Sequence, residues 1–229
     1  MTDLSVVVPV HGNADTLREL HRRIGLAAGE RDLQLILVDD ASPDQSREVI
    51  SRLDAGDPSV EAVFLERNLG QHGAVLEGLR RARGRWTVVM DADLQDPPEA
   101  IPLLLGHAGP DDDVVFAGRR GNYEGRGKLL TSRLFKRVLA ATTGLPRDAG
   151  MFFAANRRSV ERLLSLEGPS PSVVAMVGRA GLRATSIPVE RTRTLDGRSS
   201  YTPARRLRVA ARGLRWAAAR RTGAGKAGR

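Results

Sequence analysis

Short apolar runs alternate with amphipathic stretches over about the first 120 residues of the chain. The apolar runs have the length and the turn-rich borders of buried strands, and they predict strands at residues 4–9, 33–38, 60–65, 86–90 and 114–118. The stretches between them predict helices at about residues 14–28, 43–54, 72–83 and 98–105. Strands and helices that alternate in this order favour an α/β fold, with a mostly parallel, doubly wound sheet flanked by helices.

The rest of the chain is less regular. It predicts strands at residues 151–155 and 185–189, and helices at about residues 128–143, 157–166, 171–180 and 203–221. We therefore expect one folded domain at residues 1–202, followed by a basic amphipathic helix and flexible tail at residues 203–229.

Two carboxylates stand directly after the predicted strand at 86–90, ahead of the Pro97-Pro98 pair. Open α/β sheets bind ligands at the carboxyl ends of their strands. If the segment is extended, Asp91 and Asp93 point to the same side and repel each other unless a cation lies between them. Mg²⁺ is held by such carboxylates together with substrate phosphates, so this pair predicts a metal site. The alternative is a solvated acidic turn.

Polar residues and glycines follow the other predicted strands at the same edge of the sheet. Pro9 and Asn13 lie at the end of the first strand, Asp39 and Asp40 at the end of the second, and Gly70 after the third. This recurrence predicts a binding site that is shared by several strand ends.

These motifs resemble the family-2 inverting glycosyltransferases with a GT-A fold, and within them the polyprenyl-phosphate type, which includes dolichol-phosphate mannose synthase. The matching segments are Val8-Pro9-x-x-x-Asn13, Val38-Asp39-Asp40-x-Ser42-x-Asp44, Arg67-Asn68-x-Gly70 and Met90-Asp91-Ala92-Asp93-Leu94-Gln95-Asp96-Pro97-Pro98-Glu99. The last segment is highly specific to that subgroup. The resemblance is close over about the first 120 residues and scattered after them.

The resemblance implies a role for each matching residue. Asp91, Asp93 and Gln95 would hold Mg²⁺ or Mn²⁺ against the diphosphate of a nucleotide sugar. The donor pocket would be lined by Pro9, Val10, Asn13, Asp39, Asp40, Gly70, Asp91 and Ala92. The residues that would act on the reacting groups are Asp93, Arg119, Arg133 and Asp148. The two arginines suit phosphate oxygens, whereas Asp148 could be a base or could orient Arg133; the alternative for the arginines is a solvated surface position.

The chain departs from the family pattern at two positions. Ala14 stands where the family has Glu, which removes an acidic group expected near the nucleotide. Ser200 stands where the family has Lys facing the diphosphate, and we expect Arg193 or Arg198 to supply that charge.

The net charge of +9 belongs to the tail. Ten basic residues follow Asp196, the last acidic one, and the rest of the chain holds 26 basic and 27 acidic residues. An apolar stripe runs along the predicted helix at 203–221, so the helix either rests on an anionic membrane surface or packs on the body of the protein. The absence of cysteine fits a reducing cytoplasm.

The leading interpretation is a metal-dependent enzyme that moves a hexose from a GDP- or UDP-linked sugar to a polyprenyl phosphate. We expect it in the cytoplasm, and at the cytoplasmic face of the membrane if the tail binds there, because no apolar run is long enough to span a bilayer and the first residues leave no room for a signal peptide. Transfer to a hydroxyl group of a small molecule, glycan or protein is the alternative. A basic nucleic-acid-binding module is a weaker one, because the body is nearly neutral and lacks a stacking surface of aromatic and basic residues. We therefore expect no nucleic-acid partner. A family member without activity also stays open, although the complete metal-binding set argues against it.

Overall fold

The computed structural model describes residues 2–109, 112–120, 144–166 and 172–190, and the statements below concern those residues. Within them, one seven-stranded sheet has the order β3-β2-β1-β4-β6-β5-β7. Its strands are β1 (Leu4–Val10), β2 (Leu33–Asp39), β3 (Val60–Phe64), β4 (Trp86–Val89), β5 (Val114–Arg120), β6 (Phe153–Asn156) and β7 (Ala184–Glu190). The helices are α1 (Leu17–Ala28), α2 (Ser46–Gly56), α3 (Gln71–Arg81), the 3₁₀ turn η1 (Pro98–Ala100), α4 (Ile101–Gly106), α6 (Arg157–Leu164) and α7 (Val173–Arg179).

The predicted α/β class and the mostly parallel sheet are confirmed. Strands β3, β2, β1 and β4 run parallel to one another, and β5 runs parallel to β7. Every predicted element in the described ranges is present, with its ends moved by a few residues. The predicted helices at 128–143 and 203–221 lie outside those ranges, as does the proposed boundary at residue 202.

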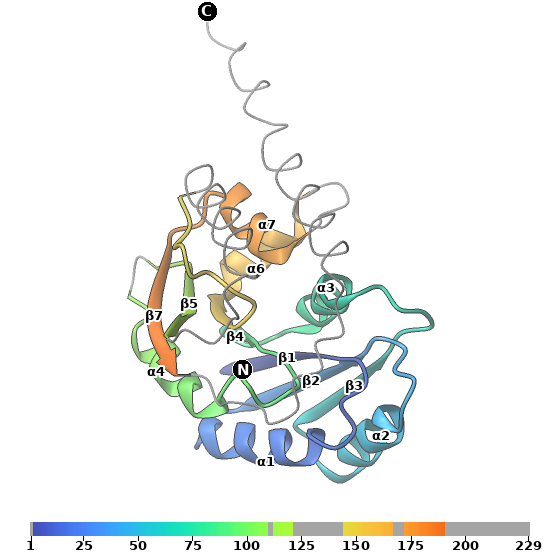
Figure 1. Ribbon diagram of the computed structural model, residues 1–229. Coiled ribbons are helices and arrows are strands. Elements are labelled where there is room, and N and C mark those ends of the chain that lie inside the picture. The colour runs from blue at the N-terminus through green and yellow to red at the C-terminus, as the bar shows by residue number, and fades with distance from the viewer. Residues whose placement is uncertain (1, 110–111, 121–143, 167–171, 191–229) are drawn as a thin grey trace, which may run out of the picture.

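Helices cover both faces of the sheet (Figure 1). Leu4, Val6 and Val8 of β1 pack with α1, α2 and α4, whereas Val7 packs with α3, α6 and α7 on the opposite face. This division follows from the two-residue period of a strand, because successive side chains point to opposite faces. Buried on both faces, the central strands are nearly continuous apolar runs. The exceptions Ser5 and Gln34 are joined by a hydrogen bond of 2.7 Å from the Ser5 hydroxyl to the Gln34 side-chain oxygen.

Helix α3 lies very close to the sheet because small residues line its inner face. Ala74 and Ala82 are buried, and a Cβ placed on Gly78 would overlap the side chain of Val7 in β1. The close approach fixes the position of the first turn of α3, which lies at the carboxyl edge of the sheet.

Strand β6 is the only antiparallel member of the sheet in the described ranges, and it lies between β4 and β5. Two reversals restore the direction, so β5 and β7 run the same way as β4. The carboxyl ends of β1, β2, β4 and β5 consequently meet at one edge, where open α/β sheets bind ligands.

Candidate active site

Asp39 and Asp40 are almost completely buried at the end of β2, with exposed fractions of 1% and 2%. The Asp39 carboxylate accepts a hydrogen bond from the backbone N–H of Ser42 at 3.2 Å. That of Asp40 accepts one from the backbone N–H of Leu69 at 2.6 Å. A carboxylate that accepts a backbone N–H is held in one orientation. Both residues therefore have fixed side chains at the edge where the sequence predicts a nucleotide.

The loop after β1 is tied to the loop after β2. The Asn13 N–H donates to Ser46 Oγ at 3.0 Å, and the Ala14 N–H donates to an Asp44 oxygen at 3.1 Å. Burial raises the pKa of Asp44, but hydrogen bonds from Ser46 and from the Ala14 N–H outweigh it, so the pKa lies below its ordinary value. Asp44 thus places a negative charge beside residue 14, where the family has Glu.

Pro9 and Val10 form the end of β1 under this loop, and both are buried. The Val10 carbonyl oxygen accepts the Asp40 N–H at 2.8 Å. Val10 therefore supports the predicted pocket through its backbone.

Asp91 and Asp93 do not lie in an extended segment, so the condition under which they would point to the same side is not met. Strand β4 ends at Val89, and a turn begins at Ala92. Ala92 is buried, its carbonyl oxygen accepts the Thr16 hydroxyl at 2.7 Å, and Leu94 has a φ of 59°. Left-handed backbone is costly for a residue with a side chain and is enriched at functional sites. The hydrogen bond from Thr16 thus holds the turn at Ala92, and a half-buried carboxylate lies on either side of that residue.

The residues of this turn fit a hard divalent cation. The carboxylates of Asp91 and Asp93 and the side-chain amide of Gln95 offer oxygen ligands, the type that Mg²⁺ and Mn²⁺ prefer. One Asp93 oxygen also accepts the backbone N–H of Gln95 at 3.0 Å, which fixes the carboxylate within the turn. No group of three His, Cys, Asp or Glu suited to a metal occurs in the described part of the chain. A cation here would therefore complete its shell with amide, substrate or water oxygens.

A short segment after β3 connects the second and fourth strand ends. Its Leu69 N–H donates to Asp40, Gly70 precedes the first turn of α3, and the Gln71 amide donates to an Asp91 oxygen at 2.5 Å. Sequence reasoning placed Gly70 in the site but missed Gln71. Its position directly after that glycine, at a strand-end loop, was the available signal.

Asp148 lies at the carboxyl end of β5. A Cβ placed on Gly118 would overlap an Asp148 carboxylate oxygen and the Ser186 hydroxyl, so the carboxylate occupies space that only glycine leaves open. This places Asp148 in the half of the sheet formed by β5 and β7, away from the strands that carry Asp39 and Asp91.

The predicted arginines are only partly placed. Arg119 directly follows Gly118 in β5, and its backbone is paired with that of Val189 in β7. Arg133, Arg193 and Arg198 lie outside the described residues.

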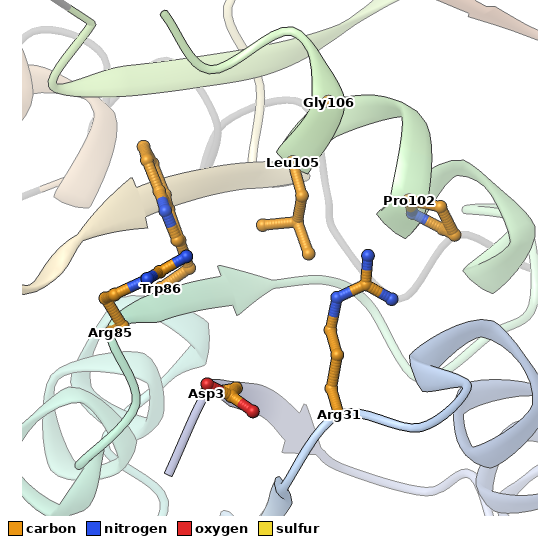
Figure 2. A pocket seen from close by; sticks show the side chains of 7 residues that line it. All are labelled: Asp3, Arg31, Arg85, Trp86, Pro102, Leu105 and Gly106. Atoms are coloured by element: carbon orange, nitrogen blue, oxygen red, sulfur yellow. The ribbon is translucent and has the colours of Figure 1, made fainter. Parts of the chain in front are cut away.

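A separate hollow of about 370 Å³ opens at the opposite edge, where β1 and β4 begin (Figure 2). It is lined by Asp3, Arg31, Arg85, Trp86, Pro102, Leu105 and Gly106. Its position at the amino ends of the strands separates it from the candidate site.

The α/β sheet carries polar side chains after the carboxyl ends of β1, β2 and β4, the edge at which open α/β sheets bind ligands. A family model described as "Glycosyl transferase family 2" matches residues 5–164. The chain belongs to this family, which confirms the resemblance found in the sequence and makes the chain a glycosyltransferase domain.

The relatives include sugar transferases of the polyprenyl-phosphate type. An undecaprenyl-phosphate 4-deoxy-4-formamido-L-arabinose transferase of Pseudomonas aeruginosa (strain LESB58) is 36% identical over 211 residues, which cover 90% of this chain and 62% of the relative. An enzyme of the same name from Klebsiella pneumoniae subsp. pneumoniae is 33% identical over 204 residues, or 87% and 62% of the two chains. The chain thus spans about 62% of the length of these relatives.

Solved structures share the fold. A mannosyltransferase from Pyrobaculum calidifontis in complex with GDP-Man and Mn²⁺ has a TM-score of 0.62 and 20% identity, and the match covers 93% of this chain and 71% of that one. Glucosyl-3-phosphoglycerate synthase from Mycobacterium tuberculosis, with Mn²⁺, UDP-Glc and phosphoglyceric acid, has a TM-score of 0.68 and 20% identity, covering 94% and 79%. Across the residues that the structure describes, none of the helices is both long and apolar enough to cross a bilayer.

Proposed function

We propose that the protein transfers a sugar from a nucleotide diphosphate sugar to a polyprenyl phosphate, with the help of Mg²⁺ or Mn²⁺ and with inversion at the anomeric carbon. The single observation that carries this proposal is the 36% identity to a polyprenyl-phosphate sugar transferase over 90% of the chain. The fixed carboxylates at the ends of β2 and β4 supply the chemistry that such a transfer needs.

On the donor side, Asp39 and Asp40 would contact the hydroxyl groups or the base edge of the nucleoside. Their carboxylates are held by backbone N–H groups, so little reorganisation accompanies binding. Asp91, Asp93 and Gln95 would hold the cation. When bound, the cation neutralises negative charge that builds up on the departing diphosphate.

On the acceptor side, an oxygen of the lipid phosphate forms a bond to the anomeric carbon while the bond from that carbon to the diphosphate oxygen breaks. A phosphate monoester is largely ionised near neutral pH, so its attack requires no general base. Arg119 and Arg133 would hold this second anion, and Asp148 would orient Arg133. Arg193 or Arg198 would face the donor diphosphate in place of the family Lys.

The sugar and the nucleotide of the donor have to be identified by experiment. The names of the two relatives contain a modified arabinose, which is a pentose, whereas the leading interpretation of the sequence has a hexose. The donor panel therefore contains GDP- and UDP-linked hexoses and pentoses.

The test is a donor screen with a short polyprenyl phosphate and Mn²⁺, in which release of the nucleoside diphosphate is followed. We expect release with at least one donor, dependence on the acceptor, loss of turnover on chelation, and a product with the opposite anomeric configuration by NMR. Turnover with a hydroxyl acceptor and none with any polyprenyl phosphate would contradict the proposed acceptor. Full turnover in the presence of a chelator would contradict the proposed metal.

The protein meets its lipid substrate at the membrane surface, in this proposal. The region at residues 203–229 would act as a basic amphipathic anchor on the cytoplasmic leaflet, next to a catalytic domain at residues 1–202. Anionic lipids attract basic segments, and each Lys or Arg near the surface contributes about 1 kcal/mol.

A further inference from the structure

Gln71 joins helix α3 to the turn that carries the predicted metal ligands. Its side-chain amide donates a hydrogen bond to an Asp91 carboxylate oxygen at 2.5 Å, and both residues are half-buried. The two residues come from different elements, since Gln71 begins α3 and Asp91 follows β4.

The backbone around Gln71 is held firmly. The Leu69 N–H donates to Asp40 at 2.6 Å, and the Gly70 N–H donates to the Asn68 side-chain oxygen at 3.1 Å. On the other side, α3 is fixed by its close approach to β1. Gln71 therefore reaches Asp91 from a rigid support.

An amide suits this task for electrostatic reasons. It orients a carboxylate without adding a positive charge, which would repel a divalent cation. It also adds no negative charge, which would repel Asp91 while the metal is away. Groups that orient a metal ligand tune its affinity, and their loss typically weakens metal binding about 10- to 100-fold.

We propose that Gln71 is a positioning residue that sets the orientation of Asp91 for the divalent cation. This inference rests on the proposed function, because it takes the turn at residues 91–95 as the metal site. It also separates two tasks of one segment: Leu69 fixes the nucleotide side through Asp40, and Gln71 fixes the metal side through Asp91.

The experiment measures Mn²⁺ affinity in the full chain, with a saturating nucleoside diphosphate, by titration calorimetry and by the loss of the free-ion EPR signal. The variant Gln71→Met keeps the length of the side chain and removes the donor. We expect the Kd for Mn²⁺ to rise about tenfold or more, whereas the Kd for the nucleotide without metal stays within about twofold. Gln45→Met, at an exposed position before α2, is the matched control and should change neither constant.

The outcomes separate this inference from the proposed function. If the wild-type protein binds Mn²⁺ and Gln71→Met binds it equally well, the role of Gln71 is refuted while the metal site stands. If the wild-type protein binds no Mn²⁺ in the presence of nucleotide, both ideas are refuted. If Gln71→Met does not fold, as judged by its thermal transition, Gln71→Ala is measured in its place and the same two comparisons decide.

Discussion

The backbone N–H of Val173 donates a hydrogen bond to Nδ1 of His72 at 3.4 Å. This contact links the first turn of α3 to the first turn of α7. The same turn of α3 contains Gln71, which contacts the predicted metal ligand Asp91. Burial lowers the pKa of His72 from 6.5 to about 4, so the ring is neutral near physiological pH and its Nδ1 can accept the hydrogen bond from the Val173 N–H. His72 is consequently a structural residue in this fold.

The lowered pKa of His72 predicts a loss of stability in mild acid. The unfolded chain binds a proton near pH 6.5 and the folded chain only near pH 4. The unfolded chain therefore gains a stabilising proton as the pH falls below about 6.5, and the folded chain does not. The stability that the neutral His72 provides is complete above that pH, and it is lost as the pH falls towards 4. From the two pKa values, the free energy of unfolding should fall by about 2 kcal/mol between pH 7.5 and pH 5.

A comparison of variants isolates this effect from other titrating groups. His72→Asn keeps an acceptor near the position of Nδ1 and cannot gain the proton, so urea unfolding should show a smaller loss on acidification than in the wild type. His107→Asn, at an exposed site in the same protein, serves as the control. Identical pH dependence in wild type and His72→Asn would show that His72 does not contribute.

Asp93→Ala should lower turnover by roughly 10²- to 10³-fold, because the departing diphosphate would lose its counter-charge. Release of the nucleoside diphosphate with Mn²⁺ measures it. Asp32→Ala, at the opposite edge of the sheet, should retain full activity. Undiminished turnover of Asp93→Ala would remove this residue from the site.

Gly118→Ala should displace the Asp148 carboxylate, since the new methyl group overlaps both that carboxylate and the Ser186 hydroxyl. Overfilling a packed site costs about 1–3 kcal/mol, and turnover should fall together with stability. Gly150→Ala is the control, because its Cβ meets only the Asp148 carbonyl oxygen at 3.9 Å. Thermal melts and turnover measured on both variants decide; equal values for the two would mean that Asp148 needs no space at residue 118.

Deletion of residues 203–229 should abolish binding to anionic liposomes, and binding of the full chain should weaken as salt is raised. Cosedimentation at low and high salt tests both effects. The region has many alanines in its apolar stripe, so charge should dominate over apolar anchoring. Equal binding by the full and shortened chains, or no binding by either at low salt, would contradict the proposed anchor.

The fold was predictable because its central strands are short, largely apolar segments with clear turn residues at their ends. Residues 4–10 and 34–39 are buried and bounded by turn residues, so their largely apolar runs could be assigned without any tertiary information. The antiparallel insertion of β6 was not predictable, since the apolar run at 153–156 carries no signal for the direction in which it pairs.

The candidate site was predictable where a strand end carries a polar residue next in sequence. Asp39, Asp40, Asp91 and Asp93 belong to that class. Gln71 does not, because its contact with Asp91 joins residues 20 positions apart and depends on how close α3 lies to the sheet. The turn at Ala92 was not predictable for a related reason: its hydrogen bond comes from Thr16, which is far away in the sequence.

The place of β6 between β4 and β5 has a consequence for the order of folding. Strand β5 precedes β6 in the chain, yet β6 alone connects it to β1–β4 among the described strands. During synthesis, β1 to β4 can assemble as soon as they emerge, whereas β5 has to wait until residue 156 has been made. We expect chains that end near residue 120 to protect β1–β4 from limited proteolysis and to leave β5 open, and chains that end after residue 190 to protect both. If the proposed function holds, the half proposed to bind the donor would be complete before the half proposed to receive the acceptor exists.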